Sequence, residues 1–174
     1  MGMMAGVLVI VSGLPGVGKS ALADALGREL VAPVLSVDPI EAAIWRCGIR
    51  PSFETGVAAY EIAAVVARHQ LQLGLTVVID AVSSLEVARE MWRDAASRAE
   101  ATTRVIEVVC GDEATHRDRL AGRVRDIDGF PEPSWDDVIA RRDEWEPWSG
   151  PRLLIDSTRR RADNLAEALS YVSR

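Results

Sequence analysis

Lysine is nearly absent from this chain of 174 residues: Lys19 is the only one, and the other 19 basic residues are arginines. Cysteine is almost as rare, since only Cys47 and Cys110 occur, too few for a disulfide framework and without the spacing of a metal site. We interpret both as reduced, buried and inert thiols, as is usual for free cysteine. No apolar run approaches the ~20 residues needed to cross a bilayer, so we expect no membrane span.

Basic residues are also outnumbered by acidic ones. The formal net charge of −6 and the isoelectric point near 5.0 argue against a nucleic-acid partner, although a local basic cleft stays open. The N-terminal segment MGMMAGVLVIVSG lacks a basic region and a cleavage site, so we expect no signal peptide. With reduced cysteines, these features predict a cytoplasmic protein. The length predicts one domain over residues 1–174, and the sequence leaves the oligomeric state open.

Strand-length apolar segments alternate with helical ones along the chain. The predicted strands are 7–11, 33–38, 76–80, 104–110 and 152–156. The predicted helices are 19–31, 56–73, 85–99, 112–124, one that starts after Ser134 as N-cap, and 161–173. The first strand, VLVIV, is continuously apolar, as expected where both faces of a sheet are covered. The alternation predicts an α/β domain with three layers around a parallel sheet, and residues 123–135 are predicted to form a surface loop.

The segment around the single lysine carries a phosphate-binding pattern. Residues 13–20 read GLPGVGKS, which fits G-x-x-x-x-G-K-[ST], and they lie between a predicted buried strand and a predicted helix. Glycines let the backbone turn several N–H groups toward phosphate oxygens, and the helix adds the positive end of its dipole. Lys19 reaches the β- and γ-phosphates as a compact ammonium, where a planar guanidinium would be bulkier, and the Ser20 hydroxyl can ligate Mg²⁺. The predicted nucleotide-binding residues here are Gly13, Leu14, Pro15, Gly16, Val17, Gly18, Lys19, Ser20 and Ala21.

Five stretches together resemble a known family, the small P-loop kinases of the nucleoside- and shikimate-kinase type. They are SGLPGVGKSALADAL, SVDPI, TVVIDAV, HRDRLAGR and LLIDST, and their order and spacing cover nearly the whole chain. The resemblance is greatest to the branch with chloramphenicol phosphotransferase, zeta toxins and the kinase domain of polynucleotide kinase. It implies a P-loop NTPase fold with a five-stranded parallel sheet in the order 2-3-1-4-5. It also implies ATP and Mg²⁺ as cofactors and an arginine-bearing helical lid, here about residues 117–148.

Two carboxylates end predicted strands. Ligands bind at the carboxyl ends of strands in an open α/β sheet, and the resemblance implies that Asp38 faces the acceptor hydroxyl. There it would orient the nucleophile and take its proton; alternatively, Asp38 caps a helix that begins at Pro39. Asp80 would hold Mg²⁺ through water if its strand neighbours the P-loop strand, and the resemblance implies the same role. Alternatively, Asp80 starts a turn into Ser83 and Ser84.

Two arginines in HRDRLAGRVR are predicted to share a helix face, because Arg119 and Arg123 lie four residues apart. The resemblance implies that Arg119 lies against the adenine and that Arg123 binds the transferred phosphate. A guanidinium suits both roles, since it stacks on a flat base and pairs with phosphate oxygens. Neutralising the transferring group would be its catalytic effect. Two alternatives stay open: a solvated helix face, and Arg125 in the place of Arg123.

Aromatic residues are concentrated near the end of the predicted lid. Trp135, Trp145 and Trp148 lie within fourteen residues, and we favour packing on the core over a wall for an aromatic or sugar-like acceptor. The predicted acceptor side consists of residues that follow Asp38, namely Trp45, Arg46, Arg50 and Phe53. His69 and His116 are isolated in the sequence and are predicted to be structural or surface residues. Asp156 resembles part of the family's adenine-side loop and is not predicted to be catalytic.

These residues together predict an ATP-dependent phosphotransferase that moves the γ-phosphate of Mg-ATP to a hydroxyl of a small molecule. The acceptor could be an antibiotic, a nucleoside, a sugar or a nucleotide-sugar. Lys19, Asp38 and Arg123 are the predicted catalytic residues, and Ser20 and Asp80 are the predicted metal ligands. Three alternatives are a regulatory ATPase or switch without a small acceptor, a nucleic-acid 5′-end kinase, and a toxin of the zeta type.

Overall fold

The computed structural model describes residues 6–125 and 127–174. Its centre is a five-stranded parallel sheet in the order β2-β3-β1-β4-β5, which confirms the predicted order. The strands are β1 (Val7–Ser12), β2 (Val34–Ser36), β3 (Val77–Ala81), β4 (Thr102–Val109) and β5 (Leu153–Asp156). The predicted strands agree with these to within three residues at every end.

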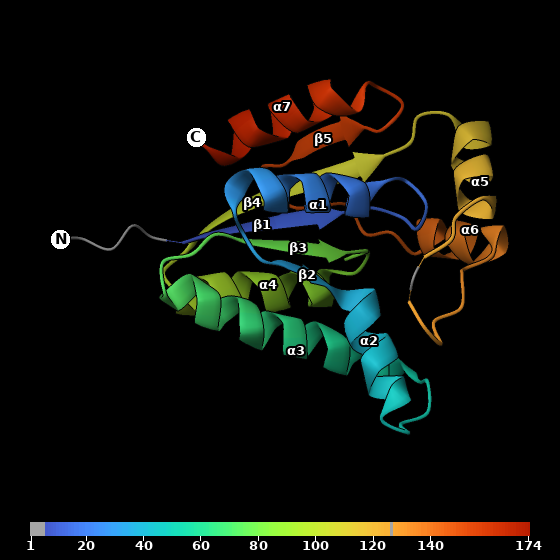
Figure 1. Cartoon of the computed structure of the whole chain (residues 1–174), viewed down its shortest axis with the longest axis horizontal. Coiled ribbons are helices and arrows are strands. Elements are labelled where there is room, and N and C mark those ends of the chain that lie inside the picture. Colours follow the sequence, from blue (N-terminus) through green and yellow to red (C-terminus); the bar gives the residue numbers. More distant parts are fainter. Residues whose placement is uncertain (1–5, 126) are drawn as a thin grey trace.

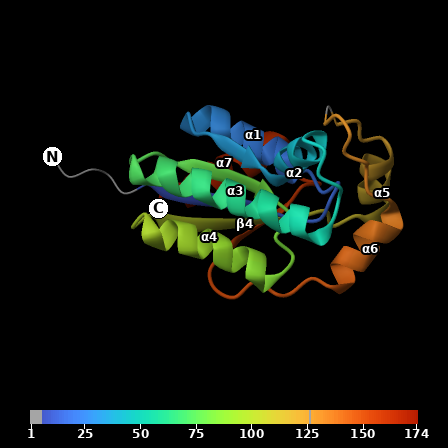
Figure 2. The same cartoon turned by 90° about the horizontal axis from the view of Figure 1, so that it is seen from below.

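Helices cover both faces of the sheet and also gather beyond its carboxyl edge (Figure 1). On one face lie α1 (Lys19–Leu30) and α7 (Arg161–Val172), and on the other lie α3 (Phe53–Gln72) and α4 (Glu86–Arg98). The end toward which the strand arrows point holds α2 (Val37–Arg46), α5 (Glu113–Ala121) and α6 (Trp135–Asp143). Figure 2, turned by 90°, shows α3 and α4 side by side, with α5 and α6 beyond the same end of the sheet. Within residues 6–125 and 127–174, no helix combines the length and apolar character needed to cross a membrane.

Side chains of β1 alternate between two cores. Leu8 and Ile10 pack in the cluster with α3 and α4, whereas Val9 and Val11 pack in the cluster with α1 and α7. All four are at most 1% exposed. A strand that is covered on both faces needs an apolar side chain at every position, which explains the uninterrupted run VLVIV.

The second strand is shorter than predicted. It ends at Ser36, and α2 begins at Val37, so Asp38 lies in the first turn of a helix and does not end a strand. The edge strand β2 pairs only with β3, over three residues, and Asp followed by Pro39 favours a helix start. A helix does start in this region, but it begins at Val37 with Ser36 as its N-cap, so the alternative prediction that Asp38 caps a helix beginning at Pro39 is wrong in its details. The side chain still lies just beyond the carboxyl edge of the sheet.

Two further predictions need correction. Cys47 is exposed and Cys110 is half-buried, because one ends α2 and the other follows the last residue of β4, so neither thiol is buried as predicted. The predicted helix 112–124 ends at Ala121, with Gly122 as its C-cap, so Arg123 lies in the following loop and not on a helix face with Arg119. The predicted N-cap Ser134 is confirmed, since its hydroxyl accepts a hydrogen bond from the Asp137 N–H.

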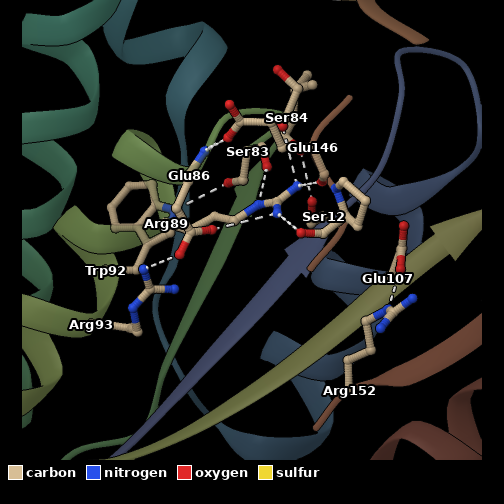
Figure 3. Close-up of polar contacts among 12 residues, drawn as sticks. Ser12, Ser83, Ser84, Glu86, Arg89, Trp92, Arg93, Glu107, Glu146 and Arg152 are labelled. Carbon is tan, nitrogen blue, oxygen red and sulfur yellow. Dashed lines mark hydrogen bonds and ion pairs between the residues drawn. The ribbon is translucent and has the colours of Figure 1, made fainter. Parts of the chain in front are cut away.

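A buried arginine fixes the segment that follows α6 (Figure 3). Arg89 on α4 is fully buried and donates hydrogen bonds to four backbone carbonyls, two after β3 and two after α6, those of Ser83, Ser84, Glu146 and Pro147. Its guanidinium lies 4.1 Å from the centre of the Trp148 ring and 5.6 Å from that of Trp145. Both tryptophans therefore pack on the core, as favoured, and do not form an acceptor wall.

We expect Arg89→Met to lower the free energy of unfolding by about 3–5 kcal/mol, because several buried carbonyls lose their donor together. In a chain of this size that loss corresponds to a fall in melting temperature of roughly 6–20 °C. The matched control is Arg93→Met on the same helix, since Arg93 is exposed and, within the part of the chain that the structure describes, forms an ion pair with Glu86 alone. Equal melting temperatures for the two variants would contradict the prediction.

Candidate functional site

The phosphate-binding pattern forms the turn between β1 and α1. Gly16 and Gly18 adopt φ angles of 84° and 98°, which residues with a Cβ rarely adopt. Gly18 is the N-cap of α1, and the first turn of that helix contains no acidic residue. The backbone N–H groups at this helix start are therefore free of side-chain caps, and together with the helix dipole they form an anion-binding surface.

Lys19 and Ser20 begin α1 at the mouth of this turn. Lys19 is only 4% exposed, so its ammonium group lies in a confined position, and Ser20 is half-buried beside it. A long guanidinium would need more room in such a place than an ammonium does. The predicted roles of the Lys19 ammonium at the phosphates and of the Ser20 hydroxyl at a metal ion stay predictions.

Asp80 lies on the strand next to the phosphate-binding turn. β3 pairs with β1, so Asp80 is opposite Val11, two residues before the turn begins. The Ser36 hydroxyl donates to its Oδ2 at 2.9 Å, whereas its Oδ1 is buried without a hydrogen-bond partner among the described residues. A buried carboxylate oxygen that lacks a donor is costly, and a hydrated Mg²⁺ ion would satisfy it. Ser20 and Asp80 thus fit the Mg²⁺ that the fold family implies.

Asp38 belongs to a chain of four charged groups. The Arg125 guanidinium donates to Asp38 Oδ2 at 2.5 Å and to Glu132 Oε1 at 2.7 Å. Arg123 lies 3.9 Å from the other oxygen of Glu132. These contacts connect the loop after α5 to the start of α2, across the carboxyl edge of the sheet.

Arg123 lies within electrostatic range of both candidate carboxylates. Burial, followed by repulsion from Arg125, lowers the pKa of Arg123 from its ordinary value, while three carboxylates act in the opposite direction: Glu132, Asp38 and Asp80. Its Nη1 is buried without a hydrogen-bond partner among the described residues, and the same is true of Arg125 Nη2. Each of the two guanidinium groups thus has a buried nitrogen without a hydrogen-bond partner among the described residues.

Arg119 lies on a different side of the turn. Its guanidinium donates to the hydroxyl of Ser157 at 2.8 Å and to the Ser157 carbonyl at 3.2 Å. A Cβ built on Gly18 would lie 3.7 Å from the Ser157 side chain, so this contact is near the start of α1. Asp156 closes the same loop by accepting bonds from the Gly111 and Thr158 N–H groups, of which the Thr158 bond is the main cause of its lowered pKa. The adenine contact predicted for Arg119 stays a prediction.

The predicted acceptor residues divide into two groups. Trp45 stacks on Phe130 with ring centres 4.8 Å apart, and Arg46 donates to the Asp128 carbonyl, so both bind the loop after α5. Arg50 and Phe53 are instead exposed, and Phe53 is 76% exposed. The structure therefore brings Trp45 and Arg46 to the side of Asp38 through contacts with this loop, and it shows no comparable contact for Arg50 and Phe53 among the described residues.

Three residues of the site carried no recognisable signal in the sequence. Glu132 joins Arg123 and Arg125, but it lies in a loop without periodicity. The Tyr60 hydroxyl accepts a bond from the Ser83 N–H just after β3, and burial raises its pKa. The imidazole of His116 contacts the carbonyl of Pro15, which lies 101 residues earlier in the chain. This contact agrees with the predicted structural role, and it is made to the phosphate-binding turn itself.

A parallel sheet in this order, with a glycine-rich turn between β1 and α1 and a carboxylate on the neighbouring strand, defines the P-loop NTPase fold. The family model for the AAA domain matches residues 8–145, which is most of the chain. The protein belongs to this AAA domain family. A comparison with curated proteins found no match.

Solved structures support the same fold. A candidate kinase from Chloroflexus aurantiacus is 23% identical, with a TM-score of 0.77, and the match covers 99% of this chain and 98% of that one. The APS kinase CysC of Mycobacterium tuberculosis, in complex with AMPPNP and APS, is 20% identical over 98% of this chain and 99% of that one, with a TM-score of 0.70. Kti12 of Chaetomium thermophilum, in complex with ADP-AlF3, is 17% identical over 95% and 98%, with a TM-score of 0.70. At these identities the likeness concerns the fold, and it agrees with the predicted resemblance to small P-loop kinases.

Proposed function

We propose that the protein is an ATP-dependent phosphotransferase that moves the γ-phosphate to a hydroxyl group of a small molecule. The observation that supports this proposal is that two carboxylates lie at the carboxyl edge of the sheet: Asp80 on the strand next to the phosphate-binding turn, and Asp38 in the first turn of α2, bound by Arg125. In-line transfer needs one carboxylate for the acceptor, one for the metal ion and a cation for the transferred group. A nucleotide switch would use the turn and Asp80, but it has no need of Asp38. The similar proteins include a kinase that binds a small molecule, APS.

Each residue has a role in the proposed reaction. The backbone N–H groups of the turn, which residues 13, 14 and 16–18 carry and Pro15 lacks, hold the β- and γ-phosphates together with Lys19. Asp38 accepts a hydrogen bond from the acceptor hydroxyl, orients its oxygen in line with the γ-phosphorus, and takes its proton as the new P–O bond forms. Arg123 neutralises charge on the transferring group. Among the described contacts Arg125 binds only Oδ2 of Asp38, which leaves Oδ1 for the hydroxyl.

Ser20 and Asp80 are the proposed holders of Mg²⁺, Ser20 directly and Asp80 through water. When bound, Mg²⁺ offsets the negative charge of the β- and γ-phosphates. Arg119 and the loop at Ser157 are the proposed contacts of the adenine. Trp45 and Arg46 are the proposed contacts of the acceptor, which is an antibiotic, a nucleoside, a sugar or a nucleotide-sugar.

The first experiment is a transfer assay with ATP and Mg²⁺, read by mass spectrometry over a panel of such acceptors and a 5′-hydroxyl oligonucleotide. Wild type is compared with Lys19→Ala and Asp38→Asn. A small-molecule product that gains one phosphate, and is lost in both variants, is the expected result. Phosphorylation of the oligonucleotide alone would favour an end kinase. Binding of ATP with no phosphorylated acceptor, and no effect of Asp38→Asn on ATP turnover, would favour the switch.

For Asp80→Asn we expect the Mg²⁺ concentration that gives half-maximal activity to rise by about 10- to 100-fold, the effect usual for residues that hold a metal through water. The measurement is a Mg²⁺ titration of the transfer rate at saturating ATP. Ser36→Ala, which removes the donor to Asp80 Oδ2, is expected to shift the titration in the same direction by a smaller factor. An unchanged Mg²⁺ requirement in Asp80→Asn would contradict the assignment.

A further inference from the structure

A buried histidine lies directly beneath the phosphate-binding turn. His116 on α5 is 6% exposed, and its Nε2 lies 2.7 Å from the carbonyl oxygen of Pro15. A carbonyl oxygen can only accept a hydrogen bond, so Nε2 carries the proton and donates it. The helix packs closely here, since a Cβ built on Gly16 would lie 3.3 Å from the imidazole and 3.1 Å from Leu120 Cδ1.

This contact fixes the orientation of one peptide group in the turn. The Pro15 carbonyl and the Gly16 N–H belong to the same planar trans peptide and point in opposite directions. Because the carbonyl is bonded to α5, outside the turn, the Gly16 N–H is directed to the opposite side, where the phosphates are expected. The hydrogen bond of His116 therefore sets the direction of a phosphate-binding donor that it does not itself contact.

The same peptide has little else to hold it. Glycine tolerates many backbone conformations, so the Gly16 side of the peptide resists rotation weakly. Within residues 13–18, the backbone hydrogen bond that the structure records is a long one, from the Val17 N–H to the Leu14 carbonyl at 3.4 Å. A side chain outside the turn is therefore needed to select one orientation.

The imidazole is itself held by the next helix. The ring of Trp135, the first residue of α6, packs edge-on against His116 with ring centres 5.1 Å apart and an angle of 82° between the planes. Arg117 covers the Trp135 ring at 5.1 Å. The orientation of the turn is thus connected through one imidazole to both α5 and α6.

We propose that His116 is a positioning residue for phosphate binding and transfer, acting through the Pro15–Gly16 peptide. This inference rests on the proposed function, because it assumes that the turn binds nucleotide phosphates. It requires that loss of the donor weakens the binding of phosphates and leaves the binding of the nucleoside part unchanged. It also requires that a side chain with an N–H at the position of Nε2 restores the effect.

The test compares His116→Leu, which has no donor, with His116→Gln, whose amide N–H lies near the position of Nε2. The control is His69→Leu, the same change at an exposed histidine on α3. Titration calorimetry gives the dissociation constants for ATP, ADP and adenosine without any acceptor. For His116→Leu we expect about tenfold weaker binding of ATP and ADP, the order expected for one lost hydrogen bond, and adenosine binding within about twofold of wild type. For His116→Gln and His69→Leu we expect binding of all three ligands within about threefold of wild type.

The outcomes separate this inference from the proposed function. If wild type binds neither ATP nor ADP, the proposed function is wrong. If wild type binds both and His116→Leu binds them equally well, or loses adenosine to the same extent, the positioning role is wrong. A His116→Gln variant no better than His116→Leu would also overturn it. If His116→Leu does not fold, as judged by its thermal transition, Trp135→Leu replaces it, with an expected loss of about fivefold for ATP and ADP, and unchanged binding in that variant would overturn the positioning role.

Discussion

Asp38→Asn is expected to lower kcat of the transfer reaction by about 10²- to 10⁴-fold, the range of a lost general base. The amide still accepts a hydrogen bond from the acceptor hydroxyl, but it does not take the proton. KM for ATP should stay within about threefold of wild type, because Asp38 lies on α2 and not in the phosphate-binding turn. Steady-state kinetics with the acceptor found in the transfer assay measure both quantities.

The ion pair of Asp38 with Arg125 calls for a second variant. Arg125→Gln breaks the same pair but keeps the carboxylate, so it separates loss of the base from release of the loop after α5. We expect it to lose less than about tenfold in kcat. Asp24→Asn, a change at an exposed position of α1, is the neutral control. Equal losses in Asp38→Asn and Arg125→Gln would mean that Asp38 acts by holding the loop and not as a base.

Lys19→Arg is expected to be about as damaging as Lys19→Ala, with kcat/KM at least about 10²-fold below wild type in both. The charge is kept in the first variant, but Lys19 is 4% exposed, and the planar guanidinium does not fit the space of an ammonium. Initial rates at low ATP concentration measure kcat/KM directly. Arginine occupies all the other positions that carry a lysine or an arginine, so Lys19→Arg tests whether this one position requires an ammonium group.

The control for this pair is Arg28→Lys, the reverse change on an exposed residue in the last turn of α1. It should leave the rate unchanged, and melting temperatures of the three variants exclude unfolding as the cause. Activity of Lys19→Arg within about threefold of wild type would show that charge alone matters at this position.

The fold was predictable because its signals are local and repeated. The first five residues of β1 are all apolar, since both faces of the strand are covered, and the glycines of the pattern GLPGVGKS mark a turn with positive φ angles. The sheet order came from the family resemblance, since periodicity alone does not say which strands are neighbours. Helix ends were less certain: Gly122 ends α5 and places Arg123 in a loop, although the spacing of the arginines suggested a common helix face.

The connections within the site could not be predicted, because they join segments that are far apart in sequence. The contact of Arg125 with Asp38 spans 87 residues, and that of His116 with Pro15 spans 101. Neither pair has a spacing rule that a sequence pattern could report. Arg89 is a similar case: one arginine among many on helices, it is fully buried only because four carbonyls from two separate segments meet at its guanidinium.

The contacts of Arg89 also determine where the chain can bend. The residues after α6 and the residues after β3 are hydrogen-bonded to the same guanidinium. Glu146 and Pro147 are therefore held to the segment that follows β3. The loop between α5 and α6 is joined to α2 by side chains such as Arg125 and Phe130, which can separate without breaking the sheet. The chain after α6 is therefore held at Glu146 and Pro147, while the first residue of α6, Trp135, packs against His116 of α5. One side chain of α4 thus anchors two segments that follow different elements at the carboxyl edge of the sheet.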